Sequence, residues 1–300
     1  MQAETKNNNC MKLNGRRESS NVEDRRGLST GAKAGIGGIG GIIIIALMTF
    51  LSGGDLGDVV NNVVQNGGLS NLQTETPAGQ REFSAEEEQL ATECKQILAS
   101  TEDVWTEVFR ENGFGEYKAP TLVLFTNSVN SACGSATAAV GPFYCSGDQK
   151  LYIDLSFFTE MKKQLGVEGN TFAYAYVIAH EIGHHVEYSL GSLGKAHEQM
   201  RQLDKTRANQ VSVRLELLAD YYAGVWAHYE DARNHSLEYG DMEKGLELAK
   251  AIGDDWLQKQ AQGYAQPESF THGTSAQRKR WLKQGFDTGD MRTTTFEGDI

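Results

Sequence analysis

The sequence predicts an α+β fold that follows a single N-terminal transmembrane helix. Residues 34–54 contain no charged side chain and read AGIGGIGGIIIIALMTFLSGG. Behind them come a few short strand-like segments and then a run of helical segments, which is typical of α+β proteins. A chain of 300 residues is long enough to bury a sizeable core.

The uncharged segment has the length of a membrane span. At about 1.5 Å per residue it would cover roughly 30 Å, the thickness of the hydrocarbon core of a bilayer. Basic residues before it include Arg16, Arg17, Arg25, Arg26 and Lys33, and the next one behind it is Arg81. The positive-inside rule therefore predicts a cytoplasmic N-terminus and an extracytoplasmic remainder. A cleaved signal peptide and a buried core helix are the alternatives.

Glycines within this segment suggest two further motifs. Gly35, Gly37 and Gly40 spell GxGxxG, but no βαβ unit surrounds them, so we expect no dinucleotide site. Gly37 and Gly41 form GxxxG, which could pair two membrane helices. We do not predict dimerisation from this motif alone.

The chain divides by composition into five parts. We expect a basic cytoplasmic tail at 1–33, the membrane helix at 34–54, a flexible spacer at 55–84, the folded domain at 85–290 and a tail at 291–300. An ordered cap on the domain is the alternative for the spacer. The net charge of −12, without a basic stripe, argues against a nucleic-acid partner.

Elements of the folded domain follow from periodicity and capping. Ser84 precedes three acidic residues within the first turn and predicts a helix that reaches Phe109. Strands are expected at 120–126, 143–145 and 151–157, the last two as a hairpin. Further helices are expected at 170–190, 207–232, 241–262 and 275–285.

The cysteines leave the disulfide pattern open. Cys133 and Cys145 could pair and close a short loop, which would contribute roughly 3 kcal/mol. Cys94 could pair with either of them instead, and Cys10 falls in the predicted cytoplasmic tail. Because no CxxC occurs, a zinc finger is not expected.

One helix carries a metal-binding motif. Residues 180–184 read HEIGH, and His180 and His184, four positions apart, share a helix face and can bind one ion. Glu181 can take a proton from water on the metal, whose pKa zinc lowers to about 7. A core helix with hydrogen-bonded histidines is the structural alternative.

A catalytic zinc needs a third protein ligand. The metzincin pattern fails because Glu187 and Leu190 stand where it requires glycine and histidine. In VRLELLAD, Glu216 and Asp220 share one face of an apolar helix, so we expect Glu216 to bind the metal and Asp220 to support a ligand histidine.

Three alternatives remain open at this centre. His185 and Glu187 are rival metal ligands that lie off the face of the two motif histidines. A buried salt bridge from the Glu216–Asp220 pair to Arg214 would serve the fold alone.

Residues outside the two helices complete the predicted site. His272, in SFTHGTSAQR, could donate to the oxyanion, with Arg278 ordering it; a surface histidine in a turn is the alternative. Peptide substrate could add as a strand along Gly141, Phe143 and Tyr144, and the hydroxyl of Tyr144 could assist the oxyanion.

Several segments carry a family resemblance. GRRESSNVEDRRG, VGPFYCSGDQKLYIDLSFF, AHEIGHHVE, SVRLELLAD, AIGDDWLQKQAQG and SFTHGTSAQRKRWLKQGFDTGD resemble the putative neutral zinc metallopeptidase family of bacterial single-pass membrane proteins. The resemblance covers Met11 to Asp290, so either Met1 or Met11 could be the start. It implies a single-pass protein of the bacterial cytoplasmic membrane, with a gluzincin-like zincin domain of a small sheet and several helices on the extracytoplasmic side.

The ELLAD segment also resembles the glutamate helix of CAAX-type and heat-shock membrane metallopeptidases. That likeness implies zinc binding by Glu216, support by Asp220 and an oxyanion role for His272. Gly273 stands where those proteins have proline, so the local turn is expected to differ.

The leading hypothesis is a membrane-anchored enzyme with one Zn²⁺ per chain that hydrolyses peptide bonds of extracytoplasmic proteins or peptides. A membrane-anchored binding or scaffold module with a non-catalytic zinc site is the alternative from another class. A hydrolase that acts on a non-peptide amide is the third possibility.

Overall fold

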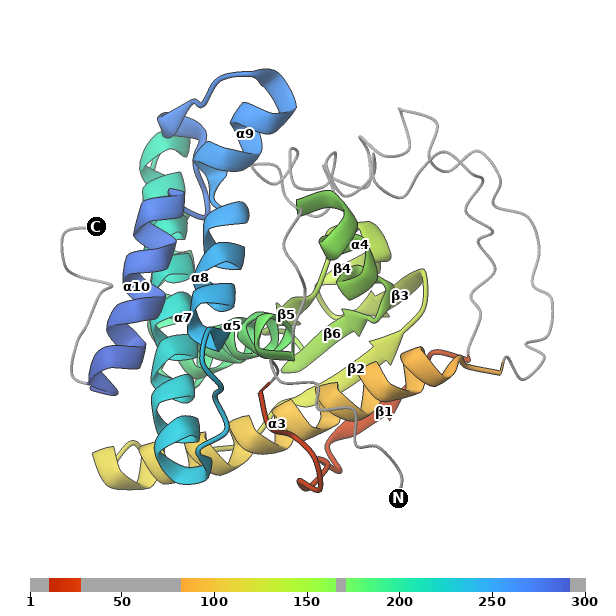
Figure 1. The fold of residues 1–300 in the computed structure, drawn as a ribbon. Helices are drawn as coiled ribbons and strands as arrows, with labels where there is room; N and C mark the ends of the chain where they lie inside the picture. The colour runs from red at the N-terminus through yellow and green to blue at the C-terminus, as the bar shows by residue number, and fades with distance from the viewer. Residues whose placement is uncertain (1–10, 28–81, 166–170, 292–300) are drawn as a thin grey trace.

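The computed structural model describes residues 11–27, 82–165 and 171–291 (Figure 1). These residues form an α+β fold with a small sheet, as the sequence predicts. In Figure 1 the helix α5 (Thr171–Leu190) lies between the sheet and a group of helices that includes α7 (Lys205–Asn234) and α10 (Ser275–Thr288). The two helices that carry the predicted metal ligands are therefore central to the fold.

The main sheet has the order β1-β2-β6-β5. Its strands are β1 (Val22–Asp24), β2 (Thr121–Phe125), β6 (Lys150–Asp154) and β5 (Phe143–Cys145). β2 lies parallel to both β1 and β6, whereas β5 and β6 form the predicted antiparallel hairpin. β5 is an edge strand of this sheet, so it keeps a row of backbone groups that β6 does not pair.

A second, two-stranded sheet was not predicted. It consists of β3 (Ser128–Ser131) and β4 (Gly134–Thr137), and the short 3-10 helix η1 (Ala138–Val140) follows. β6 also ends earlier than expected, because Asp154 accepts a 2.9 Å hydrogen bond from the backbone N–H of Ser156 at the start of α4 (Ser156–Leu165).

The helices follow the predicted order with two additions and one break. α3 (Ala85–Asn112) begins at the predicted cap, where Ser84 accepts from the N–H of Glu87. α4 and α6 (Ser192–Met200) are the additions. The helix expected at 241–262 is two helices, α8 (Asp241–Ala251) and α9 (Asp254–Gln262). They break at Gly253, where a Cβ atom would lie 2.4 Å from the backbone nitrogen of Ser275.

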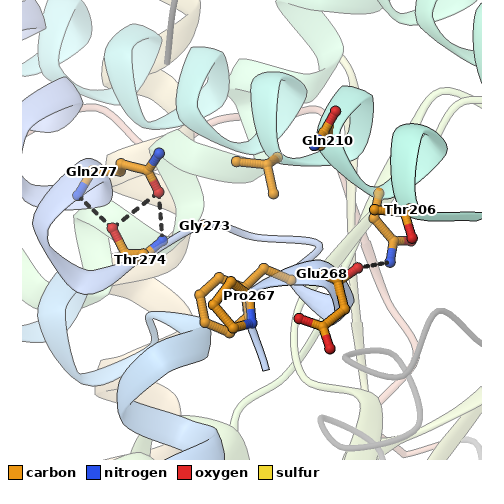
Figure 2. A pocket seen from close by; sticks show the side chains of 10 residues that line it. Thr206, Gln210, Pro267, Glu268, Gly273, Thr274 and Gln277 are labelled. Carbon is orange, nitrogen blue, oxygen red and sulfur yellow. Dashed lines mark hydrogen bonds between the residues drawn. The ribbon is translucent and has the colours of Figure 1, made fainter. Parts of the chain in front are cut away.

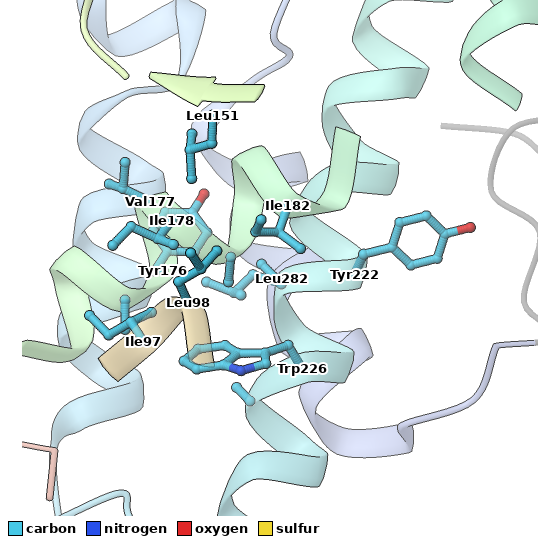
Figure 3. Close-up of a cluster of buried hydrophobic side chains, with 14 of the residues drawn as sticks. Ile97, Leu98, Leu151, Tyr176, Val177, Ile178, Ile182, Tyr222, Trp226 and Leu282 are labelled. Carbon is cyan, nitrogen blue, oxygen red and sulfur yellow. The ribbon is translucent and has the colours of Figure 1, made fainter. Parts of the chain in front are cut away.

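The hydrophobic core lies where α3, α5, α7, α10 and β6 meet (Figure 3). One buried side chain from each shows this: Leu98, Ile178, Trp226, Leu282 and Leu151, each at most 1% exposed. Full burial of such side chains stabilises a fold by about 1.5–3 kcal/mol each. This packing fixes α5 and α7 relative to each other, which is what a metal centre shared between them requires.

Residues 11–27 belong to the folded domain. Met11 and Leu13 are buried in the core, and β1 pairs with β2. Arg16 forms an ion pair with Glu230, which is 1% exposed. The cytoplasmic tail predicted from the sequence for these residues is therefore wrong.

The predicted single-pass membrane topology is wrong. One crossing at residues 34–54 would place β1 and β2 on opposite sides of a bilayer, yet they are neighbouring strands of one sheet. Within the part of the chain that the structure describes, no helix has the length and apolar character to cross a membrane. Residues 34–54, with their GxxxG motif, and 55–81 of the predicted spacer lie outside the described residues.

The N-terminal arginines that suggested a membrane topology form ion pairs within the fold. Arg17 pairs with Glu102 and Asp103 of α3, and Arg26 pairs with Asp24 and Glu88. Arg17 and Arg26 are thus complementary to acidic residues of α3 within the fold. The predicted location in the bacterial cytoplasmic membrane is wrong as well.

The structure decides between the disulfide alternatives. Cys133 and Cys145 are bonded, with their Cα atoms 5.8 Å apart, whereas Cys94 is a buried free thiol. The bond ties the turn between β3 and β4 to the end of the edge strand β5. Cys10 lies outside the described residues.

Candidate metal centre

The two ligand-bearing helices approach each other closely because of one glycine. Gly183 lies inside the HEIGH motif, and a Cβ atom there would lie 2.8 Å from the backbone oxygen of Ala219 on α7. Real Cβ atoms do not come this near a backbone oxygen. Glycine therefore permits the helix crossing that brings Glu216, three residues before Ala219, beside the motif histidines.

The predicted ligands converge on one point. Nε2 of His180 lies 3.2 Å from Oε2 of Glu216, and Nε2 of His184 lies 3.5 Å from Oε1 of the same carboxylate. One donor atom from each of the three residues lies within 4.8 Å of the others. Tetrahedral zinc with ligands at about 2.0–2.1 Å separates its donor atoms by roughly 3.4 Å. The residues present therefore fit a zinc ion.

Each ligand histidine is held at its outer nitrogen by a carboxylate. Nδ1 of His180 donates to Asp220 at 2.8 Å, and Nδ1 of His184 donates to Glu187 at 2.9 Å. Because an ionised carboxylate can only accept, it places the proton on Nδ1 and leaves Nε2 to bind a metal. Glu187, considered above as a rival ligand, instead supports His184. Its position three residues later on the same helix is the signal that could have indicated this role.

The electrostatics of the centre favour positive charge. Burial opposes protonation of both rings, but Asp220 outweighs it and raises the pKa of His180 to about 10. Glu187 and Glu216 likewise outweigh burial and raise the pKa of His184 to about 9. A divalent cation among these carboxylates would supply the positive charge that they favour.

Asp220 accepts hydrogen bonds from three residues. Arg278 donates to it from Nε at 2.8 Å and from Nη2 at 3.0 Å, and the hydroxyl of Tyr176 donates at 2.6 Å, in addition to the bond from His180. Burial raises its pKa, but Arg278 and His180 outweigh burial and lower the pKa to about 2. Asp220 is therefore paired with Arg278, and not with Arg214 as the structural alternative proposed.

Glu181 is positioned by the edge strand. Its Oε2 accepts a 2.9 Å hydrogen bond from the backbone N–H of Tyr144 on β5. Burial raises the pKa of this carboxyl group, which suits a group that must both take up and release a proton near neutral pH. The predicted substrate strand, Gly141, Phe143 and Tyr144, therefore lies next to the predicted base.

His185 is a structural residue. Its Nε2 donates to the backbone oxygen of Lys118 at 2.7 Å, and its Nδ1 accepts from the hydroxyl of Tyr144 at 2.9 Å. Burial lowers its pKa, so the ring stays neutral. The hydroxyl of Tyr144 is thus engaged with His185, away from the oxyanion role suggested for it above.

Asp254, which was not predicted from the sequence, positions His272. One oxygen of Asp254, a fully buried side chain, accepts the backbone N–H groups of Thr271, His272 and Gly273 at 2.8, 2.7 and 3.0 Å. The other lies 3.2 Å from Nδ1 of His272. Burial lowers the pKa of this histidine, but Glu216 and Asp254 outweigh burial and raise it. The position of Asp254 at the start of α9 offered no sequence signal beyond an acidic first turn.

The turn after His272 differs from the proline-containing turn, as expected. Gly273 has φ +93°, whereas proline is fixed near −65°. Arg278, expected to order His272, contacts Asp220 instead.

Comparisons with known proteins agree with this centre. Residues 11–296 match the family model described as putative neutral zinc metallopeptidase. The chain is 43% identical over 292 residues to a protein of Escherichia coli K12 named uncharacterized protein YpfJ, covering 93% of this chain and 96% of that protein. It is 42% identical over 183 residues to uncharacterized protein Mb2605 of Mycobacterium bovis, covering 58% and 61%. No solved structure matches.

Proposed function

The chain belongs to the putative neutral zinc metallopeptidase family, and from that premise we propose that it hydrolyses peptide bonds in proteins or peptides with one zinc ion. The observation that carries the proposal is the convergence of His180, His184 and Glu216, with each imidazole held at Nδ1 by a carboxylate. Zinc held by these residues would supply the Lewis acidity that activates water at neutral pH.

The residues around the centre divide the proton transfers between them. Glu181 takes a proton from the attacking water and returns it to the leaving amine. The N–H of Tyr144 holds its carboxylate in place for both steps. His272, positioned by Asp254 and favoured in its protonated form, donates to the oxyanion as negative charge develops there.

The edge strand β5 supports binding of an extended peptide. Within the described ranges of the chain it pairs with β6 alone, so substrate can add along Gly141, Phe143 and Tyr144 on the other side. The N–H of Tyr144 is occupied by Glu181, which places the base beside a peptide bound along this strand.

Replacement of Glu181 by glutamine tests the proposal. We expect stoichiometric zinc in both proteins, measured by mass spectrometry of the metal, and a loss of about 10²–10⁴-fold in peptide cleavage by the variant. Glu198→Gln on α6 is the matched control, because that side chain is exposed and pairs with Arg201. Wild-type protein that purifies without zinc and binds none would contradict the proposal. Full biological activity of the Glu181→Gln protein would favour a scaffold role.

A further inference from the structure

A pocket is lined in part by the residue that follows His272 in the chain. It lies between the N-terminal half of α7, the 3-10 helix η2 (Pro267–Ser269) and the turn that leads into α10 (Figure 2). We propose that this pocket receives one uncharged, mainly apolar side chain of the substrate, from a residue close to the scissile bond. This inference rests on the proposed peptidase function and names the substrate residue that the enzyme would select.

The position of the pocket links it to the reacting atoms. Val213 lines it and lies one helical turn before Glu216 on α7. Gly273, which follows His272 directly, lines it as well and packs near Val213, since a Cβ atom there would lie 3.2 Å from Cγ1 of that valine. One turn of helix is about 5.4 Å. A side chain near the scissile bond can therefore reach the inner end of the pocket.

The volume of the pocket suits a single side chain. It measures about 250 Å³, below the roughly 300–1,000 Å³ of pockets that enclose a whole small-molecule ligand. A peptide that lies along β5 would need such a pocket for one residue only.

The chemistry of the wall favours an apolar occupant. Val213 and Phe270 are buried apolar side chains, 6% and 7% exposed. Four of the polar residues in the wall are bonded in pairs: Asn209 donates to the backbone oxygen of Glu268 at 3.1 Å, and Gln277 accepts from the N–H and hydroxyl of Thr274, both at 2.9 Å. These groups are committed to the fold. A polar side chain packed against Val213 and Phe270 would lose water without gaining hydrogen bonds from these two apolar groups.

Charge at the rim excludes acidic side chains. Among the described residues that line the pocket, Glu268 is the one charged residue, and it is exposed. Its carboxylate would repel aspartate or glutamate in the substrate, and this described lining has no lysine or arginine to pair with them. We therefore expect leucine, methionine or phenylalanine to be preferred and acidic residues to be rejected.

Binding to a variant without the base tests the pocket separately from catalysis. The zinc-loaded Glu181→Gln protein is titrated with fluorescent peptides of glycine and serine that carry one varied residue, leucine, phenylalanine, alanine or aspartate. We expect the apolar peptides to bind at least about 10-fold more tightly than the aspartate peptide. Gln210→Trp, added to the same protein, places an indole in the pocket and should abolish the preference. Arg207→Trp adds the same side chain nearby on α7, at an exposed residue that does not line the pocket, and should preserve it.

The outcomes separate the two proposals. Equal binding of all peptides, or an unchanged apolar preference in the Gln210→Trp protein, overturns the pocket assignment. If the preference depends on Gln210 as expected while wild-type protein cleaves none of these peptides or a digest of mixed proteins, the pocket stands and the peptidase function fails. If wild-type protein cleaves the peptides regardless of the varied residue, the peptidase function stands and the pocket assignment fails.

Discussion

Asp220→Asn is the sharpest test of how the metal centre is held. The substitution keeps the size of the side chain and removes its charge. Asp220 accepts from His180, Tyr176 and Arg278 and is inaccessible to solvent. Loss of a carboxylate that orients a ligand histidine lowers metal affinity about 10- to 100-fold, which corresponds to roughly 1.4–2.8 kcal/mol.

The same substitution should weaken the fold through a different partner. Arg278 is 3% exposed and would keep a buried charge without its carboxylate. Removal of one member of a buried ion pair costs about 3–5 kcal/mol. We therefore expect the metal-free variant to lose about that much free energy of unfolding.

Two measurements separate these effects. Competition with a chelator of known affinity gives the zinc dissociation constant, and urea denaturation in the presence of excess chelator gives the free energy of unfolding. The double variant Asp220→Asn, Arg278→Met should recover much of the stability, since it removes the orphaned charge, and should not recover zinc affinity. Wild-type zinc affinity in the single variant would refute the role of Asp220 in orienting His180. A double variant as unstable as the single one would refute the assignment of the loss to Arg278.

Three further predictions concern other parts of the structure. Gly183→Ala should cost about 1–3 kcal/mol of stability and weaken zinc binding, because the new methyl group would meet the backbone of Ala219 and force α5 and α7 apart. Thermal unfolding measures the loss of stability, and chelator competition measures the loss of zinc affinity. A variant with unchanged stability and zinc affinity would refute the close crossing of the two helices. Asp254→Asn should lower kcat/KM by up to about 100-fold with zinc content unchanged, because it disturbs His272 and its loop and leaves the three metal ligands in place; a loss of zinc would contradict this. Hydrogen bonds from two basic neighbours lower the pKa of Glu23, so its stabilisation is present above about pH 4.3 and is lost as pH falls through the lowered value. Amide exchange in β1, corrected for intrinsic rates, should then accelerate near pH 3 relative to pH 6, and equal protection at both values would refute the contribution of this ion pair.

The parts of the fold and site that sequence predicted are those with local signals. Ser84 and the acids behind it mark the start of α3, and the spacing of His180 and His184 places both on one helix face. Glu216 could be chosen because a carboxylate in an apolar helix needs a partner. In each case the relevant residues lie within a few positions of one another.

The parts of the fold and of the site that could not be predicted from the sequence depend on contacts between distant segments. Asp254 reaches a loop that lies 17 to 19 residues later, and no periodicity connects the two. Arg278 was assigned to the nearby His272, although its partner is Asp220 on another helix. Arg17 was interpreted as part of a topology signal because its acidic partners on α3, Glu102 and Asp103, lie more than eighty residues away.

The parallel pairing of β1 with β2 has a consequence for biosynthesis. Val22 lies opposite Leu122, so at about 5–20 residues per second the first strand emerges from the ribosome roughly 5–20 seconds before its neighbour. Until then its edge has no partner in this sheet. Residues 14–27 are mostly polar and rich in arginine, a composition that discourages association between nascent chains. The N-terminal segment is therefore suited to remain solvated during synthesis and to pair with β2 after that strand has been made.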